Sequence, residues 1–211
     1  MDAPKSQLLI VQPRQAGYSG QVPALTLLMV GSAVLSQFIP GSARWLIYDR
    51  AAILSGEIWR MFTGHWVHFS IQHFAYDVLA LGLASWIIET RRLRYFGWLC
   101  FVAPWTISAL LLVFEPQMQF CGGLSGLATS AIIFLAVSGL RDPAPWCWVC
   151  RGVLLGTVGK ILIETQTGHM LFATTENIVT VSSVSSHIAG AILGLALAVA
   201  TRQPRLHGDH E

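Results

Sequence analysis

The chain contains six apolar stretches, each of about the length that crosses a lipid bilayer. They cover residues 24–39, 66–89, 95–114, 123–140, 146–163 and 179–200. A helix needs about 20 mostly apolar residues to span the hydrocarbon core. Of the 211 residues, 54% are hydrophobic and 11% are charged, which is typical of a polytopic membrane protein. We therefore predict an all-α fold, a bundle of six membrane-spanning helices over residues 24–200.

The two ends of the chain are more polar than this bundle. Residues 1–23 are predicted to be a cytoplasmic N-terminal segment, and residues 201–211 a cytoplasmic C-terminal tail. Because further spans follow the first apolar stretch, we interpret it as a retained helix and not as a cleaved signal peptide. The longest connection, residues 41–65, mixes aromatic and charged side chains, and such a mixture favours an interfacial or partly inserted segment.

Lysine and arginine are distributed unevenly over the two sides of the predicted bundle. With the N-terminus in the cytoplasm, the inner side holds Lys5, Arg14, Arg91, Arg92, Arg94, Arg141, Arg151, Arg202 and Arg205, and the outer side holds Arg44, Arg50, Arg60 and Lys160. Positive residues accumulate on the cytoplasmic side of membrane proteins, so both termini are predicted to be cytoplasmic. The net charge of +2, without a basic stripe, gives no indication of a nucleic-acid partner.

Four polar groups lie inside three of the apolar stretches: His73 with Asp77, Ser125, and His187. An ionisable group at membrane depth costs about 2.5–3.5 kcal/mol, so such groups usually face a shared interior and mark function. In the predicted orientation all three stretches begin on the outer side. At 1.5 Å per residue, the four groups lie within roughly 17 Å of those ends. A serine and a histidine in one such interior suggest nucleophilic catalysis inside the membrane.

Ser125 follows Gly122 and Gly123 and precedes Gly126, at the predicted start of a helix. Backbone N–H groups at a helix start suit a developing oxyanion, which would make the serine a candidate nucleophile. Small residues also line the interfaces between membrane helices, so helix packing is an alternative interpretation of this motif.

His187 shares one helix face with Gly190 and Gly194, because the spacings are three and seven residues. The glycines would let another helix approach and bring a partner side chain to the imidazole. A serine hydroxyl needs a base to become a nucleophile, and histidine has a suitable pKa. A histidine that simply hydrogen-bonds to a neighbouring helix is the structural alternative.

More histidines precede or begin the second stretch. His73 and Asp77 are four residues apart, and they could donate to an oxyanion, orient a water or relay protons. A structural polar pair that ties two helices together is equally compatible with this spacing. His65 and His68 could bind a metal ion, although two histidines make an incomplete site.

A C-x-x-C motif, Cys147 to Cys150, opens the fifth stretch. Such a motif can be redox-active or bind metal in the right fold. Here it has no strand–helix–strand context and no second cysteine or histidine pair nearby. We therefore interpret both residues as buried thiols.

Taken in order, these motifs resemble the rhomboid intramembrane serine proteases. The resemblance covers about residues 24–200 and rests on Trp59-Arg60-x-Phe62-Thr63, His68-x-x-x-x-His73-x-x-x-Asp77, Glu89, Gly123-Leu124-Ser125-Gly126 and His187-x-x-Gly190-x-x-x-Gly194. The segment Thr63-Gly64-His65 also resembles the rhombosortase subgroup, whose members are thought to process proteins with a Gly-Gly-containing C-terminal membrane anchor.

The resemblance implies a Ser–His dyad, with Ser125 as nucleophile and His187 as general base. It implies that His73 and the Ser125 backbone N–H donate to the oxyanion, with Gly123 beside them, and that His68 organises water. Transmembrane or C-terminally anchored proteins would be cleaved near the outer face of a bacterial inner membrane, without a metal ion or organic cofactor. Gly194 would support close packing of the fourth and sixth helices, and Arg60 and Glu89 would be structural polar groups.

Asp77 departs from the family pattern, which has an asparagine donor at this position. An ionised carboxylate only accepts hydrogen bonds and would repel an oxyanion. Either Asp77 is protonated and donates, or it pairs with a charged His73 and keeps that donor positive. We expect one of these two arrangements.

Three other functions are compatible with the sequence. A catalytically inactive rhomboid-like protein would bind membrane clients without cutting them, and Asp77 is the feature that favours it. A proton-coupled transporter could use the same buried groups, but no paired broken helices are evident. A zinc-dependent hydrolase could use His65 and His68, but H-E-x-x-H is absent from the sequence.

Overall fold

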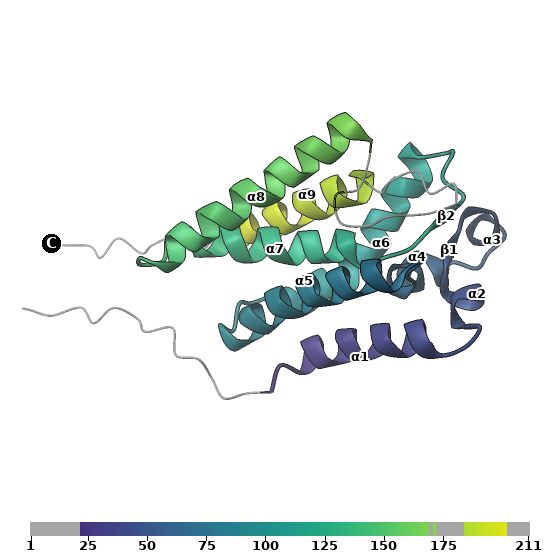
Figure 1. Ribbon diagram of the computed structural model, residues 1–211, viewed down its shortest axis with the longest axis horizontal. Helices are drawn as coiled ribbons and strands as arrows, with labels where there is room; N and C mark the ends of the chain where they lie inside the picture. The colour runs from purple at the N-terminus through teal and green to yellow at the C-terminus, as the bar shows by residue number, and fades with distance from the viewer. Residues whose placement is uncertain (1–21, 169–170, 172–183, 202–211) are drawn as a thin grey trace, which may run out of the picture.

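The computed structural model describes residues 22–168, 171 and 184–201, and this part of the chain is mostly helical. Its elements are α1 (Ala24–Phe38), α2 (Ser42–Leu46), β1 (Tyr48–Asp49), α3 (Arg50–Leu54), α4 (Arg60–Thr63), the 3-10 helix η1 (Gly64–Trp66), α5 (Ile71–Thr90), α6 (Phe96–Phe114), β2 (Phe120–Cys121), α7 (Ser125–Gly139), α8 (Trp146–Thr167) and α9 (Val184–Ala200). The six longer helices form a bundle (Figure 1). The predicted N-terminal segment and C-terminal tail lie almost wholly outside the described residues, as does the start of the last predicted span.

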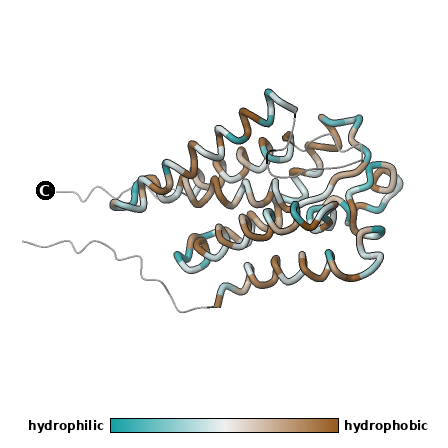
Figure 2. Tube along the Cα trace, in the orientation of Figure 1, coloured by the Kyte–Doolittle hydropathy of each residue, from teal (hydrophilic) through white to brown (hydrophobic). Residues whose placement is uncertain are grey.

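The described helices differ in their ability to cross a membrane. Three of them, α5, α6 and α8, are long and apolar enough by themselves, whereas α1, α7 and α9 are apolar but have 15, 15 and 17 residues. Figure 2 shows hydrophobic residues along the helices and hydrophilic ones gathered near the turns between them. The apolar helices agree with a membrane protein, and the count of six spans remains a prediction.

The outer surface of the bundle carries many large apolar side chains. Leu28 on α1 is 67% exposed, Phe114 at the end of α6 is 71% exposed, and Leu155 on α8 is 74% exposed. Large apolar side chains exposed in this number are unfavourable in water and favourable against lipid tails. The surface therefore fits a chain embedded in a bilayer.

The predicted second span, residues 66–89, begins later than expected. Helix α5 starts at Ile71, and the Ser70 hydroxyl accepts a hydrogen bond from His73 N at 3.1 Å. A serine cap of this type satisfies one of the N–H groups that a helix start leaves without a partner. His68 therefore lies in the connection before the helix, and His73 lies in its first turn.

The connection between α1 and α5 is a folded unit and not an open loop. Arg60 holds it together, because its guanidinium donates to Glu57 Oε2 at 2.7 Å and to the carbonyls of Ile47 and Arg44 at 3.0 and 3.2 Å. Strand β1 pairs antiparallel with β2, with Tyr48 opposite Cys121. This two-stranded pairing, which the all-α prediction did not include, ties the connection to the segment just before α7.

Glu89 joins the end of α5 to the beginning of α1. Its Oε1 accepts from Leu25 N at 3.0 Å, and its Oε2 accepts from Thr26 N at 2.7 Å and from Thr26 Oγ1 at 2.6 Å. A carboxylate at a helix N-terminus satisfies backbone donors and interacts favourably with the helix dipole. Glu89 therefore has the structural role that the sequence resemblance implied.

Helix α7 lies at the centre of the bundle, and α9 packs directly on its backbone. A Cβ atom added at Gly190 would collide with Gly126 O, and one added at Gly194 would collide with Ser130 O. Close approach of this kind is available only to residues without a side chain. The glycine spacing had predicted the close approach of another helix, and the family resemblance had implied that the fourth and sixth helices pack there. The structure shows this contact between α7 and α9.

We predict that Gly194→Ala lowers the thermal stability of the protein in detergent by several degrees. Overpacking of a tight contact costs about 1–3 kcal/mol. The matched control is Gly156→Ala on α8, where an added Cβ meets nothing within 4 Å and alanine has the better helix propensity. Unfolding followed by circular dichroism measures both variants, and equal midpoints would contradict the prediction.

His65 links the first connection to α6. Its Nε2 lies 3.0 Å from Pro104 O and 3.0 Å from Ser108 Oγ, and the Ser108 hydroxyl donates to Met61 O at 2.6 Å. Burial lowers the pKa of His65 from 6.5 to about 4, and hydrogen bonds to the backbone offset only part of this effect. His65 is therefore neutral at pH 7 and donates its Nε2 proton to the carbonyl.

We predict that His65 makes the protein less stable as the pH falls from about 6.5 to about 4. In this window the unfolded chain binds a proton at His65 and the folded chain does not. The free energy of unfolding therefore decreases as the pH falls below 6.5. The full effect is about 3 kcal/mol. Unfolding midpoints measured across this range should depend less on pH in His65→Gln than in the parent, and parallel curves would contradict the assignment.

Candidate functional site

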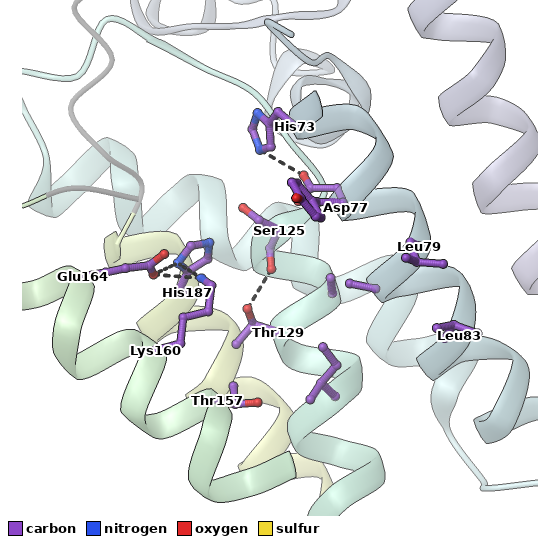
Figure 3. A pocket seen from close by; sticks show the side chains of 14 residues that line it. His73, Asp77, Leu79, Leu83, Ser125, Thr129, Thr157, Lys160, Glu164 and His187 are labelled. Atoms are coloured by element: carbon purple, nitrogen blue, oxygen red, sulfur yellow. Dashed lines mark hydrogen bonds and ion pairs between the residues drawn. The ribbon is translucent and has the colours of Figure 1, made fainter. Parts of the chain in front are cut away.

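A cavity of about 430 Å³ lies among α5, α7, α8 and α9. Its polar wall includes side chains from all four helices, and Figure 3 shows them facing the same space. Four of the six predicted site residues line it: His73, Asp77, Ser125 and His187. Residues 114 positions apart in the sequence therefore meet at one place.

Ser125 is the first residue of α7, as the sequence predicted. Its own carbonyl accepts from Thr129 Oγ1 at 2.8 Å, so its backbone is held in the first helical turn. Gly123, two residues earlier, has a φ of +118°, a conformation that side-chain-bearing residues rarely adopt. The turn at Gly123 places the serine at the cavity with the free N–H groups of a helix start beside it.

His73 lies directly against Gly123. A Cβ atom added at Gly123 would stand 2.7 Å from His73 Cε1 and 2.8 Å from His73 Nε2, so any side chain there would displace the imidazole. Glycine at this position therefore serves two purposes, the turn and the space for the ring. The contact brings α5 next to the segment that leads into Ser125.

Asp77 lies between two imidazoles. Its Oδ2 is 3.1 Å from His73 Nε2 and 3.2 Å from His68 Nε2. The His73–Asp77 pair agrees with their spacing of four residues, and His68 is its third member. His68 Nε2 is also 3.3 Å from Leu124 N, and the tautomer of His68 decides which of its two contacts is a hydrogen bond.

His187 has a carboxylate partner on the side away from its free nitrogen. His187 Nδ1 is 2.8 Å from Glu164 Oε2, and the Lys160 ammonium is 2.8 Å from the same oxygen and 3.3 Å from Nδ1. Among the described residues His187 Nε2 has no hydrogen-bond partner, and the side chain is 2% exposed. Figure 3 shows this trio on the α8 side of the cavity.

Glu164 was not predicted as a site residue from the sequence, and Lys160 was assigned to the outer side. The predicted fifth span ended at residue 163, one residue before Glu164, whereas α8 continues to Thr167. Lys160 lies inside this helix and lines the cavity. A lysine and a glutamate four residues apart in an apolar stretch are the signal that could have revealed this buried pair.

The other candidate ligands of the sequence point to different places. His65 Nε2 contacts Pro104 O and Ser108 Oγ, whereas His68 Nε2 faces Asp77, so the two histidines have separate partners. Cys147 and Cys150 are both buried and are not joined by a disulfide. Within the described ranges no three His, Cys, Asp or Glu side chains are grouped as metal ligands would be.

The sequence of this chain is similar to those of known proteins. Residues 55–204 match the Rhomboid domain. Relatives named rhomboid protease GlpG from Salmonella paratyphi A, Salmonella newport and Salmonella heidelberg are each 28% identical over 157 residues, which is 73% of this chain and 52% of the relative. The chain thus spans about half the length of the curated relatives that it matches.

Proposed function

Since this chain belongs to the rhomboid family, we propose that it is an intramembrane serine endopeptidase. The main supporting observation is that Ser125 and His187, from α7 and α9, line one cavity. His187 Nε2 is without a partner among the described residues, as the acceptor of a serine proton must be. The relatives that are named as proteases support the same reaction.

In the proposed mechanism, His187 Nε2 takes the hydroxyl proton of Ser125 while the serine oxygen attacks a peptide carbonyl. The tetrahedral intermediate collapses when His187 gives that proton to the leaving amine, and an acyl-enzyme remains. Water, deprotonated by His187, then attacks the ester, and His187 returns this proton to the Ser125 oxygen as the second product leaves. Protein side chains perform every proton transfer in this sequence.

The negative oxygen of the intermediate would be stabilised from the α5 side. The donors we propose are His73 and the Ser125 backbone N–H, with Gly123 providing the room that His73 occupies. Asp77 Oδ2 faces two imidazoles, and a single proton on that oxygen cannot serve both of them. An ionised Asp77 accepts from His68 Nε2 at 3.2 Å and lies 3.1 Å from His73 Nε2, close enough to attract a charged imidazole. We therefore favour the arrangement in which Asp77 keeps His73 positively charged and His68 holds Asp77 in place.

We further propose six membrane spans, cytoplasmic termini and an active site toward the outer face of a bacterial inner membrane. His73 lies in the first turn of α5, whereas Arg91, Arg92 and Arg94 follow the other end of that helix. Positive residues mark the cytoplasmic side, so the cavity would open on the opposite one. Transmembrane or C-terminally anchored proteins are the proposed substrates. The rhombosortase resemblance suggests anchors that contain Gly-Gly, and glycine near the cleavage site would help the substrate helix to unwind.

We predict that a fluorophosphonate probe labels the purified protein and that Ser125→Ala and His187→Ala reduce labelling at least about 100-fold. The reason is that a serine becomes nucleophilic only with its base in place. The matched control is Ser130→Ala on the same helix, because Ser130 donates to Leu127 O and does not line the cavity. A folded parent that is not labelled would instead favour a client-binding protein without protease activity.

We predict that Asp77→Asn changes the pH dependence of this labelling, because asparagine has no charge with which to hold His73 protonated. Asp142→Asn is the control, since Asp142 pairs with Arg91 just beyond the far end of α5. The labelling rate is measured from pH 5 to about pH 9 in all three proteins. Indistinguishable profiles for Asp77→Asn and the parent would remove Asp77 from the mechanism.

A further inference from the structure

We propose that Glu164 is a positioning residue for His187. Its carboxylate accepts the Nδ1 proton of the imidazole and thereby leaves Nε2 unprotonated toward Ser125. The inference rests on the proposed peptidase function and deepens it, because it adds a carboxylate from α8 to the serine and histidine. A base that is oriented by a third group is the general logic of nucleophilic triads.

The carboxylate of Glu164 is fixed on both of its oxygens. Oε2 receives His187 Nδ1 at 2.8 Å and Lys160 Nζ at 2.8 Å, and Oε1 receives Leu171 N at 3.1 Å. Glu164 is 0% exposed, so water does not compete for these positions. A buried ion is unfavourable unless it is paired and hydrogen-bonded, and the three donors meet this requirement.

Lys160 competes with Glu164 for His187 Nδ1, so the carboxylate determines which tautomer the imidazole adopts. The ammonium lies 3.3 Å from His187 Nδ1 and can only donate. An Nδ1 that accepted this hydrogen bond would leave the imidazole proton on Nε2, and such a histidine could not take a proton from Ser125. A carboxylate can only accept, so Glu164 enforces the opposite tautomer from a shorter distance, and it engages the ammonium at the same time.

The position of Glu164 on α8 is not explained by helix packing alone. Within Trp146–Thr167 the buried residues are Cys147, Cys150 and Glu164, and the rest of the helix is partly or fully exposed. Figure 1 shows α8 on the outside of the bundle beside α7 and α9. The one side chain that this lipid-facing helix buries near its C-terminal end is therefore the carboxylate on His187.

The test compares Glu164→Ala, Glu164→Gln and the double variant Glu164→Ala/Lys160→Met with the parent full-length chain in detergent. We expect Glu164→Ala to lower the rate of Ser125 labelling by a fluorophosphonate about 100-fold or more, since the lysine then holds the wrong tautomer. The double variant should recover at least about tenfold, because no cation remains at Nδ1. Glu164→Gln should fall between, since its amide oxygen still accepts but carries no charge.

The control is Glu115→Gln, which removes another carboxylate near α9. Glu115 accepts from Ser185, two residues before His187, and does not line the cavity. Unfolding midpoints of every variant separate a loss of folding from a loss of reactivity. Parent-like labelling of Glu164→Ala would overturn the inference, and labelling lost through Ser125→Ala would still support the proposed peptidase.

A second readout does not depend on reactivity. Nitrogen-15 NMR of ring-labelled histidine, with the His187 signals assigned from His187→Ala, reports which nitrogen carries the proton. We expect the Nδ1-protonated form in the parent and the Nε2-protonated form in Glu164→Ala. The same tautomer in both proteins would overturn the inference. A parent that is not labelled by the probe would contradict the proposed peptidase function, and the NMR result alone would then test whether Glu164 sets the tautomer of His187.

Discussion

The close backbone contact between α7 and α9 brings the two proposed catalytic residues to one cavity. In lipid, helices associate through packing and hydrogen bonds, because lipid tails are as apolar as the side chains. Gly190 and Gly194 let α9 lie on the carbonyls of Gly126 and Ser130. His187 precedes Gly190 by three residues on the same face, so the contact that packs the helices also delivers an imidazole to the start of α7.

Carboxylates then join this central pair to the helices around it. Glu89 binds backbone donors of α1, Asp77 faces His68 of the first connection, and Glu164 links α8 to His187 of α9. An unpaired charge would be unfavourable at these depths, so each carboxylate requires its partner from another segment. Two of these carboxylates, Asp77 and Glu164, also line the cavity and contact histidine nitrogens.

The sequence predicted the parts of this arrangement that periodicity and local chemistry determine. Apolar length located the helices, and the spacing of His187, Gly190 and Gly194 predicted a close interface. The antiparallel pairing of β1 with β2 had no such signal, because strands of two residues have no periodicity and depend on a partner about 70 residues away. Glu164 was missed because the span was ended where hydropathy falls, although the helix continues for a further turn.

The candidate site draws its side chains from four different helices. Ser125 and His187 lie on α7 and α9, which pack closely at Gly190 and Gly194, whereas Asp77 and Glu164 come from α5 and α8. Buried residues lie at both ends of α8, and Glu164 is the one near the C-terminal end. The helix that forms this wall of the cavity therefore also supplies the carboxylate that contacts His187 Nδ1.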